Sequence, residues 1–209
     1  KMPNGSDVRA VHHTADNRIF AGGYNEIGEI KRDEYGRFYY ESLIEIISAD
    51  EIDFGLIWQI ESLDEQLIIR SFTRLIILSD NKATLIPTND IFWSLDIINN
   101  NVLVSTNDGI YRLDPESLEL QLIVDSSGFN AERVVAILPL QGDDTMIFTR
   151  QGNSYLFNTK EGTVIFDRTH VESPQLDQIF CARRSSTGIY LLGTINNFIK
   201  YYEKKKILV

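Results

Sequence analysis

VVAILPLQGDDTMIFTRQGNSYLFNTKEGTVIF, residues 134–166, decides the fold because it holds four short apolar runs separated by polar turns. The runs cover residues 134–137, 146–149, 155–157 and 163–166. The turns contain Gly142, Gly152 and Asn153, and glycine and asparagine tolerate the positive φ that tight hairpin turns demand. The stretch therefore predicts four antiparallel strands joined by hairpins.

The same order of runs and turns occurs five times along the chain. Matching Ser105, Thr149 and Gly193 in the second runs of three successive copies gives a spacing of 44 residues twice, whereas the earlier steps are 48 and 35 residues. The first runs are 8–11, 57–60, 92–95, 134–137 and 179–182; the second are 19–22, 67–70, 103–106, 146–149 and 191–194; the third are 27–30, 75–78, 110–113, 155–157 and 198–201. A weaker fourth run follows in four copies, at 37–40, 83–86, 120–123 and 163–166.

Four short strands in roughly 40–50 residues are typical of a β-propeller blade, so we predict an all-β propeller. A β-sandwich or barrel is the alternative, because it also has short strands at close spacing. The matched order of runs in all five copies favours the propeller, with the first runs as its innermost strands. We predict one propeller segment, 1–209, with repeats at 8–53, 54–90, 91–132, 133–177 and 178–209.

About five blades or part-blades are present, and the last stops after three strands. A propeller has to close, since an open blade leaves an apolar face and an unpaired edge in water. Either five blades close here, with residues 1–7 completing the last sheet, or the chain is part of a larger ring. The start at Lys1 and the lysine-rich end favour a piece of a larger propeller.

Composition agrees with an all-β soluble chain. Ile occurs 27 times and Ala 8 times in 209 residues, and Ile suits a pleated sheet whereas Ala is the best helix former. The net charge of −10 argues against contact with nucleic acid or an anionic membrane. No apolar run approaches the roughly 20 residues of a membrane helix. The basic cluster at 204–206 fits a solvated tail.

Five stretches resemble the sensor propellers of bacterial two-component regulators; they are residues 2–9, 18–28, 53–58, 132–139 and 178–182. In that family an extracytoplasmic propeller precedes a triple-tyrosine β-sandwich, a transmembrane helix and an output module, either a histidine kinase or a LuxR-type DNA-binding domain. The W-I-G-T strand of the hybrid-kinase branch is absent, with Leu192-Gly193-Thr194 nearest to it, which favours the LuxR-type branch. The resemblance implies a periplasmic segment that provides sensing or structural support, with no signalling chemistry of its own.

Catalytic chemistry is not indicated by the sequence. Cys181 lies in an apolar innermost run and is expected to be a buried packing residue. His12 and His13 are adjacent at a strand end, so they point to opposite faces and are expected to be solvated. Asp96 is the only carboxylate within an innermost strand, so a glycosidase pair is not evident. We predict no catalytic residue, cofactor or metal site.

Two sets of residues are candidates for ligand binding. An acid precedes each innermost strand and could join an acidic funnel for a cation or sugar hydroxyls, although aspartate also favours such loops. These acids are Asp7, Asp53, Asp90, Glu132 and Asp177. Aromatic and polar residues form the second set, because aromatic faces stack on sugars and Arg or Asn bonds hydroxyls and carboxylates. It comprises Tyr24, Asn25, Trp58, Trp93, Arg183 and Arg184, although Trp58 and Trp93 are expected to pack between blades.

We therefore expect an extracytoplasmic propeller that senses a ligand or mediates dimerisation. Its expected partners are the rest of the same propeller, a second protomer and a carbohydrate. A purely structural scaffold is one alternative, and a small glycan-active propeller enzyme is the other.

Overall fold

The structure is a computed structural model that describes residues 2–47, 53–80, 82–114, 116–166, 178–194 and 198–202. These residues form nineteen strands and two short 3-10 helices, η1 (Ile44–Ile46) and η3 (Ser126–Phe129). None of the helices in these ranges has the length and apolar character needed to cross a membrane. The chain divides into two compact units, Lys1–Phe92 and Trp93–Val209.

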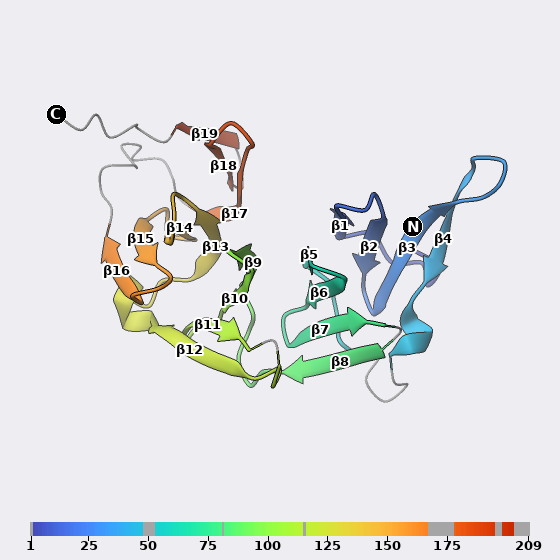
Figure 1. The fold of residues 1–209 in the computed structure, drawn as a ribbon, viewed down its shortest axis with the longest axis horizontal. Helices are drawn as coiled ribbons and strands as arrows, with labels where there is room; N and C mark the ends of the chain where they lie inside the picture. Colours follow the sequence, from blue (N-terminus) through green and yellow to red (C-terminus); the bar gives the residue numbers. More distant parts are fainter. Residues whose placement is uncertain are drawn as a thin grey trace. The chain divides into compact units, whose positions relative to one another are not determined.

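The first unit holds two four-stranded antiparallel sheets, each with its strands in sequence order. One sheet consists of β1 (Ala10–His13), β2 (Ile19–Gly23), β3 (Glu26–Arg32) and β4 (Phe38–Ser42). The other consists of β5 (Gln59–Leu63), β6 (Gln66–Arg70), β7 (Arg74–Ser79) and β8 (Lys82–Pro87). Both appear in blue to green in Figure 1.

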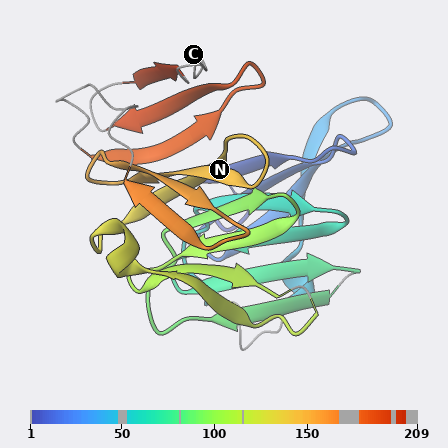
Figure 2. The ribbon, with the colours of Figure 1, turned by 60° about the vertical axis from the view of Figure 1, so that its left-hand side comes forward.

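The second unit holds three sheets, which Figures 1 and 2 show from two sides. The first has β9 (Ser94–Ile98), β10 (Asn101–Ser105), β11 (Gly109–Leu113) and β12 (Leu120–Asp125). The next has β13 (Val134–Pro139), β14 (Asp144–Thr149), β15 (Ser154–Asn158) and β16 (Thr163–Phe166). The last has β17 (Ile179–Arg184), β18 (Ile189–Thr194) and β19 (Phe198–Tyr202).

Within each unit the first strands of neighbouring sheets contact each other, β1 with β5, β9 with β13 and β13 with β17. Side chains bond these sheets together. Asp96 on β9 accepts a hydrogen bond from Ile137 N–H on β13 at 2.9 Å, and the Ser105 hydroxyl bonds the Val134 carbonyl at 3.1 Å. At the other end of β13, the Tyr190 hydroxyl donates to the Pro139 carbonyl at 2.9 Å. First strands therefore run side by side in the same direction, as innermost strands of propeller blades do.

Apolar side chains fill the space between the sheets. One cluster in the first unit gathers Phe20, Ile57, Ile69 and their neighbours. Two more lie in the second unit, one around Phe129 and Ile147, and one around Phe148 with its neighbours on β17 and β18. Middle strands of a blade can be buried on both faces, and Leu75 to Leu78 of β7 are all buried.

The prediction of strands from the runs is confirmed, because every run overlaps a strand of the expected rank. The first runs are the least accurate, since Val8, Trp58 and Trp93 precede the strands β1, β5 and β9 rather than opening them. Val11 of β1 is 62% exposed, so the first run of that repeat is buried on one face only. The repeat boundaries stay a prediction.

Candidate functional site

Each blade has two ends, and they carry different side chains. We call the end where the first strand begins the leading end; the turn between the second and third strands lies there too. The trailing end carries the turns between the first and second strands and between the third and fourth. This division follows from the antiparallel order of every sheet.

The leading end of the first unit holds Tyr24, Asn25 and Asp53. Asn25 has a φ of 47° and bonds the loop before β5, because its Oδ1 accepts from Gly55 N–H at 2.6 Å. Its Nδ2 donates to Asp53 at 3.2 Å. Tyr24 is 50% exposed beside them. The structure thus brings three predicted residues together, with Asn25 acting as a connector between two loops.

Trp58 and Phe72 form an exposed aromatic pair at the same end of the first unit. Their ring centroids lie 5.0 Å apart, and each side chain is 38% exposed. The expected packing of Trp58 between blades is therefore wrong, because Trp58 lies in the loop before β5 and not in the strand. Asp90 lies half-buried in the loop before β9, where its N–H donates to Thr88.

The leading end of the second unit holds two arginines stacked on aromatic rings. The Arg133 guanidinium lies 3.5 Å from the ring centroid of Trp93, and the Arg150 guanidinium lies 3.8 Å from that of Phe180. Arg150 N–H donates to the Arg133 carbonyl at 2.8 Å, so the two residues are adjacent across the start of β13 and the end of β14. We call Trp93, Arg133, Arg150 and Phe180 the arginine–aromatic cluster.

Trp93 is held in place by a further contact. Its Nε1–H donates to Asn107 Oδ1 at 2.9 Å, which ties it to the β10–β11 turn. Trp93 is therefore half-buried under Arg133 of the next sheet, and it precedes β9 rather than lying in the strand. Three successive sheets supply the cluster, through the loops before β9 and β13, the β14–β15 turn, and β17.

Glu132 precedes Arg133 and binds the β14–β15 turn with both of its carboxylate oxygens. Thr149 Oγ1 donates to Glu132 Oε2 and Asn153 Nδ2 donates to Glu132 Oε1, both at 2.6 Å. Its two carboxylate oxygens thus fix the turn that carries Arg150. Glu132 was predicted to bind a ligand, but here its carboxylate holds the β14–β15 turn in position.

Neither arginine of the cluster forms an ion pair with a carboxylate of the described residues. Burial, together with the positive charge of Arg150, holds the pKa of Arg133 below its usual value. A hollow of about 260 Å³ lies here, lined by Asn107, Ala131, Glu132, Arg133, Arg150 and Gln151. It concentrates positive charge in a protein whose net charge is −10.

Arg183 and Arg184 lie elsewhere. They end β17 and pair with Leu191 and Tyr190, which places them at the trailing end. They therefore lie at the opposite end of the second unit from the cluster. The remaining candidate, Asp177, lies outside the described residues.

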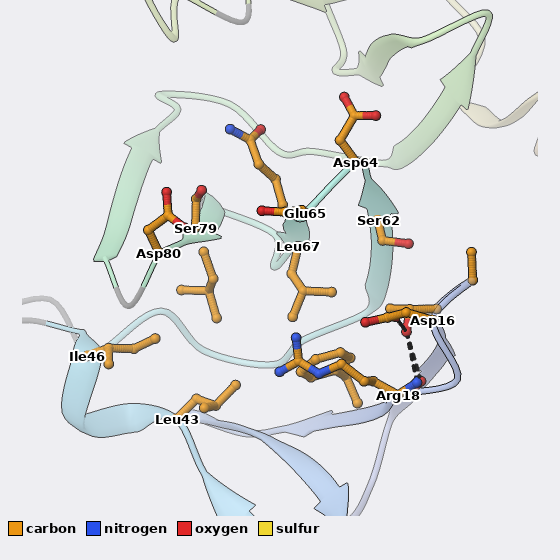
Figure 3. A pocket seen from close by; sticks show the side chains of 15 residues that line it. Asp16, Arg18, Leu43, Ile46, Ser62, Asp64, Glu65, Leu67, Ser79 and Asp80 are labelled. Carbon is orange, nitrogen blue, oxygen red and sulfur yellow. Dashed lines mark hydrogen bonds between the residues drawn. The ribbon is translucent and has the colours of Figure 1, made fainter.

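A larger cavity of about 720 Å³ opens at the trailing end of the first unit (Figure 3). Leu43 before η1, Ile46 of η1 and Leu67 of β6 give it an apolar side, and Asp64 and Asp80 also line it. Arg18 also lines it, but its guanidinium bonds Glu29 at 2.8 and 3.1 Å. These acids differ from those predicted to form a funnel.

Three other expectations can be compared with the structure. Cys181 is exposed, not buried, because a bulge between Ile179 and Cys181 turns Phe180 and Cys181 outward together. His12 is not solvated, because its ring bonds the Ser62 hydroxyl at 2.8 Å on the neighbouring sheet. Asp96 is 4% exposed and bonds the backbone of β13.

No three His, Cys, Asp or Glu side chains of the described ranges are grouped closely enough to hold a metal ion. The acids Asp7 and Asp53 of the first unit are exposed. Asp53 accepts from the Asn25 side chain of another loop, and Glu132 accepts from Thr149 and Asn153.

The chain is similar in structure to several known β-propellers. It matches the extracellular domain assigned to a hybrid two-component system of Bacteroides thetaiotaomicron with a TM-score of 0.68 and 13% identity, over 93% of this chain and 26% of that one. It matches the extracellular domain assigned to a one-component system of the same organism with a TM-score of 0.58 and 16% identity, over 97% and 33%. Virginiamycin B lyase from Staphylococcus aureus matches with a TM-score of 0.69 and 13% identity, over 98% and 72%.

These likenesses establish the fold, and the all-β propeller prediction is confirmed. The neighbours include extracellular domains of the class that the sequence resemblance indicated. This chain spans about a quarter to a third of the length of those domains. No family model and no curated protein sequence matches the chain.

Sequence reasoning missed Arg133 and Arg150. One signal could have found the first, because Trp58, Trp93 and Arg133 occupy the same position in consecutive repeats, directly before the first paired residue of the innermost strand. Arg150 comes directly after the second run in the same repeat. Comparing those two positions across repeats would have singled out this pair of arginines.

Proposed function

We propose that this chain is the ligand-sensing propeller of a bacterial regulator, located outside the cytoplasm in the periplasm and without catalysis of its own. It binds a small molecule, a glycan or a glycan breakdown product, at the leading end of the second unit. A change in the packing between two protomers then passes the signal to the output module of the whole protein.

The observation that carries this proposal is the arginine–aromatic cluster. Guanidinium groups on aromatic rings present flat surfaces and several hydrogen-bond donors together, which suits recognition of hydroxyl and acidic groups. The cluster is partly open, since Phe180 is 43% exposed. In a purely structural role, we would expect carboxylates of the chain to pair with both arginines.

The position of the cluster also supports a sensing role. It joins residues from the loops before β9 and β13, the β14–β15 turn and β17, so one ligand would contact three sheets. Binding would favour one spacing of these sheets over another. A ligand shifts such an equilibrium only by its difference in affinity for the two states.

The structural neighbours support an extracytoplasmic sensor. Two of them are extracellular domains assigned to bacterial signalling systems. The proposal transfers that setting to this chain on the likeness of fold and on the sequence resemblance together. At 13–16% identity, these neighbours do not indicate which ligand this chain binds.

Calorimetric titration of the full chain against a panel of oligosaccharides, half acidic and half neutral, tests the proposal. We expect heat with at least one member, and sedimentation velocity with and without that member to show a change in association. A panel without any heat would overturn ligand sensing and favour the structural scaffold.

An enzyme is the second alternative, because virginiamycin B lyase shares the fold. The same panel, analysed by chromatography after incubation, distinguishes it from a sensor. Product formation that disappears in Asp96→Asn would favour the glycan-active enzyme. We expect unchanged oligosaccharides, because Asp96 is buried and bonds a backbone N–H.

A further inference from the structure

The two arginines of the cluster lie side by side without a carboxylate partner among the described residues. Arginines are almost never fully buried in proteins unless they are paired, because a charge that is taken out of water loses solvation. Arg133 and Arg150 are both adjacent and like-charged, which adds repulsion to that cost. A negative group beside both half-buried guanidinium groups would relieve this repulsion.

The hollow between the two arginines has a lining that suits a negative group. Asn107 and Gln151 add amide groups to the two guanidinium groups of its lining. The single carboxylate in the lining, Glu132, has both oxygens bonded to Thr149 and Asn153. A volume of about 260 Å³ suits one acidic group with part of the ring or chain that carries it.

We propose that the hollow between Arg133 and Arg150 binds the oxyanion of the sensed ligand, a carboxylate or a sulfate on a sugar. The inference rests on the proposed sensing function and names the class of its ligand, an acidic saccharide. Planar guanidinium forks match the geometry of a carboxylate, and charge-assisted hydrogen bonds to it are about twice as strong as neutral ones. The rings of Trp93 and Phe180 stack against the two guanidinium groups and hold them in place.

Trp93 provides a direct readout. The chain has two tryptophans, so Trp58→Phe leaves Trp93 as the only one, 3.5 Å from the Arg133 guanidinium. Fluorescence titration of this full-length variant would use a tetragalacturonate, a sulfated galactan tetrasaccharide, maltotetraose and inorganic sulfate. The first two separate carboxylate from sulfate, maltotetraose reports neutral sugar binding, and inorganic sulfate reports the oxyanion alone.

We expect one acidic tetrasaccharide to bind at least about tenfold more tightly than maltotetraose, because it adds charge-assisted hydrogen bonds. Its affinity is expected to fall as salt rises from about 20 mM to about 300 mM, because mobile ions screen the two positive charges. Arg133→Gln and Arg150→Gln are expected to weaken its binding about tenfold to hundredfold, and Arg133→Lys less.

Arg112→Gln is the matched control, because it removes the same charge from an exposed position on β11 where the side chain bonds Gln121. It is expected to bind within about twofold of the parent, since distant exposed charges are screened. Circular dichroism and thermal melting of each variant establish that it is folded. The comparison of acidic with neutral sugars in the parent protein stands even where a variant does not fold.

The two possible failures can be told apart. Equal affinity for acidic and neutral sugars, with no effect of either arginine substitution, would overturn the oxyanion site and leave ligand sensing in place. Binding of inorganic sulfate alone, without any saccharide, would also overturn the inference. No response to any of the four probes, with no heat in the calorimetric panel, would remove the sensing function as well.

Discussion

Replacing Asp96 by alanine should weaken the contact between two blades of the second unit. The Asp96 carboxylate is 4% exposed and accepts from Ile137 N–H at 2.9 Å, while Ile137 itself is fully buried. Asp96→Ala removes the charged acceptor and leaves that N–H unsatisfied in an apolar environment. A hydrogen bond to a charged group contributes about 1.5–3 kcal/mol, so we expect a loss of about 2–3 kcal/mol in the free energy of unfolding.

Urea denaturation followed by circular dichroism and by tryptophan emission measures this loss. For a chain of this size it corresponds to a drop of roughly 4–12 °C in melting temperature. The slope of the urea transition should stay the same, because the surface exposed on unfolding does not change.

Asp143→Ala is the control, since Asp143 is exposed in the β13–β14 turn and such surface substitutions usually stay within about 0.5 kcal/mol. Asp96→Asn keeps an oxygen that can accept and should fall between the two. If Asp96→Ala and Asp143→Ala had equal stabilities, the carboxylate would not link the blades and the reasoning would be refuted.

Three further outcomes are expected. Tyr190→Phe loses the 2.9 Å bond to the Pro139 carbonyl and should lower stability by about 1 kcal/mol in urea; no change would contradict a role in joining blades. Cys181 should react with a thiol reagent in the native protein at nearly the rate seen in urea, whereas reaction only after unfolding would contradict its exposure. Stability should fall as the pH drops below about 5, because backbone N–H groups lower the folded pKa of three carboxylates below the unfolded value. Their stabilisation is full above the unfolded pKa and is lost as the pH falls through the folded one. Replacing all three with asparagine should make the urea midpoint depend less on pH. An unchanged dependence on pH would contradict this. The three are Asp33, Asp114 and Asp125.

The order of strands could be predicted from sequence because it rests on local signals. Apolar runs and turn residues such as Asn17, Gly142 and Gly188 act within a few positions, and all three have positive φ in the structure. The start of the first strands was less predictable. Trp58 and Trp93 look like strand residues by propensity, but they lie in loops and contact Phe72 and Arg133 there.

The candidate site depended on contacts between blades, which sequence spacing does not reveal. Arg133 and Arg150 are 17 residues apart, and their adjacency comes from the β13–β14 pairing. The error at Cys181 has a local cause, because a bulge at Phe180 breaks the alternation of the strand. The predicted acids were placed correctly in loops, yet Asp53 and Glu132 bond neighbouring side chains.

The described sheets are separate hydrogen-bonded ladders, and the links between them include side chains such as Asp96, Ser105 and Tyr190 and single backbone bonds such as that from Ile179 N–H to the Arg150 carbonyl. A gene segment that encodes one blade can therefore be duplicated or deleted without cutting through a ladder. Evolution can change the number of blades in steps of one repeat, provided that the few linking side chains are copied with it.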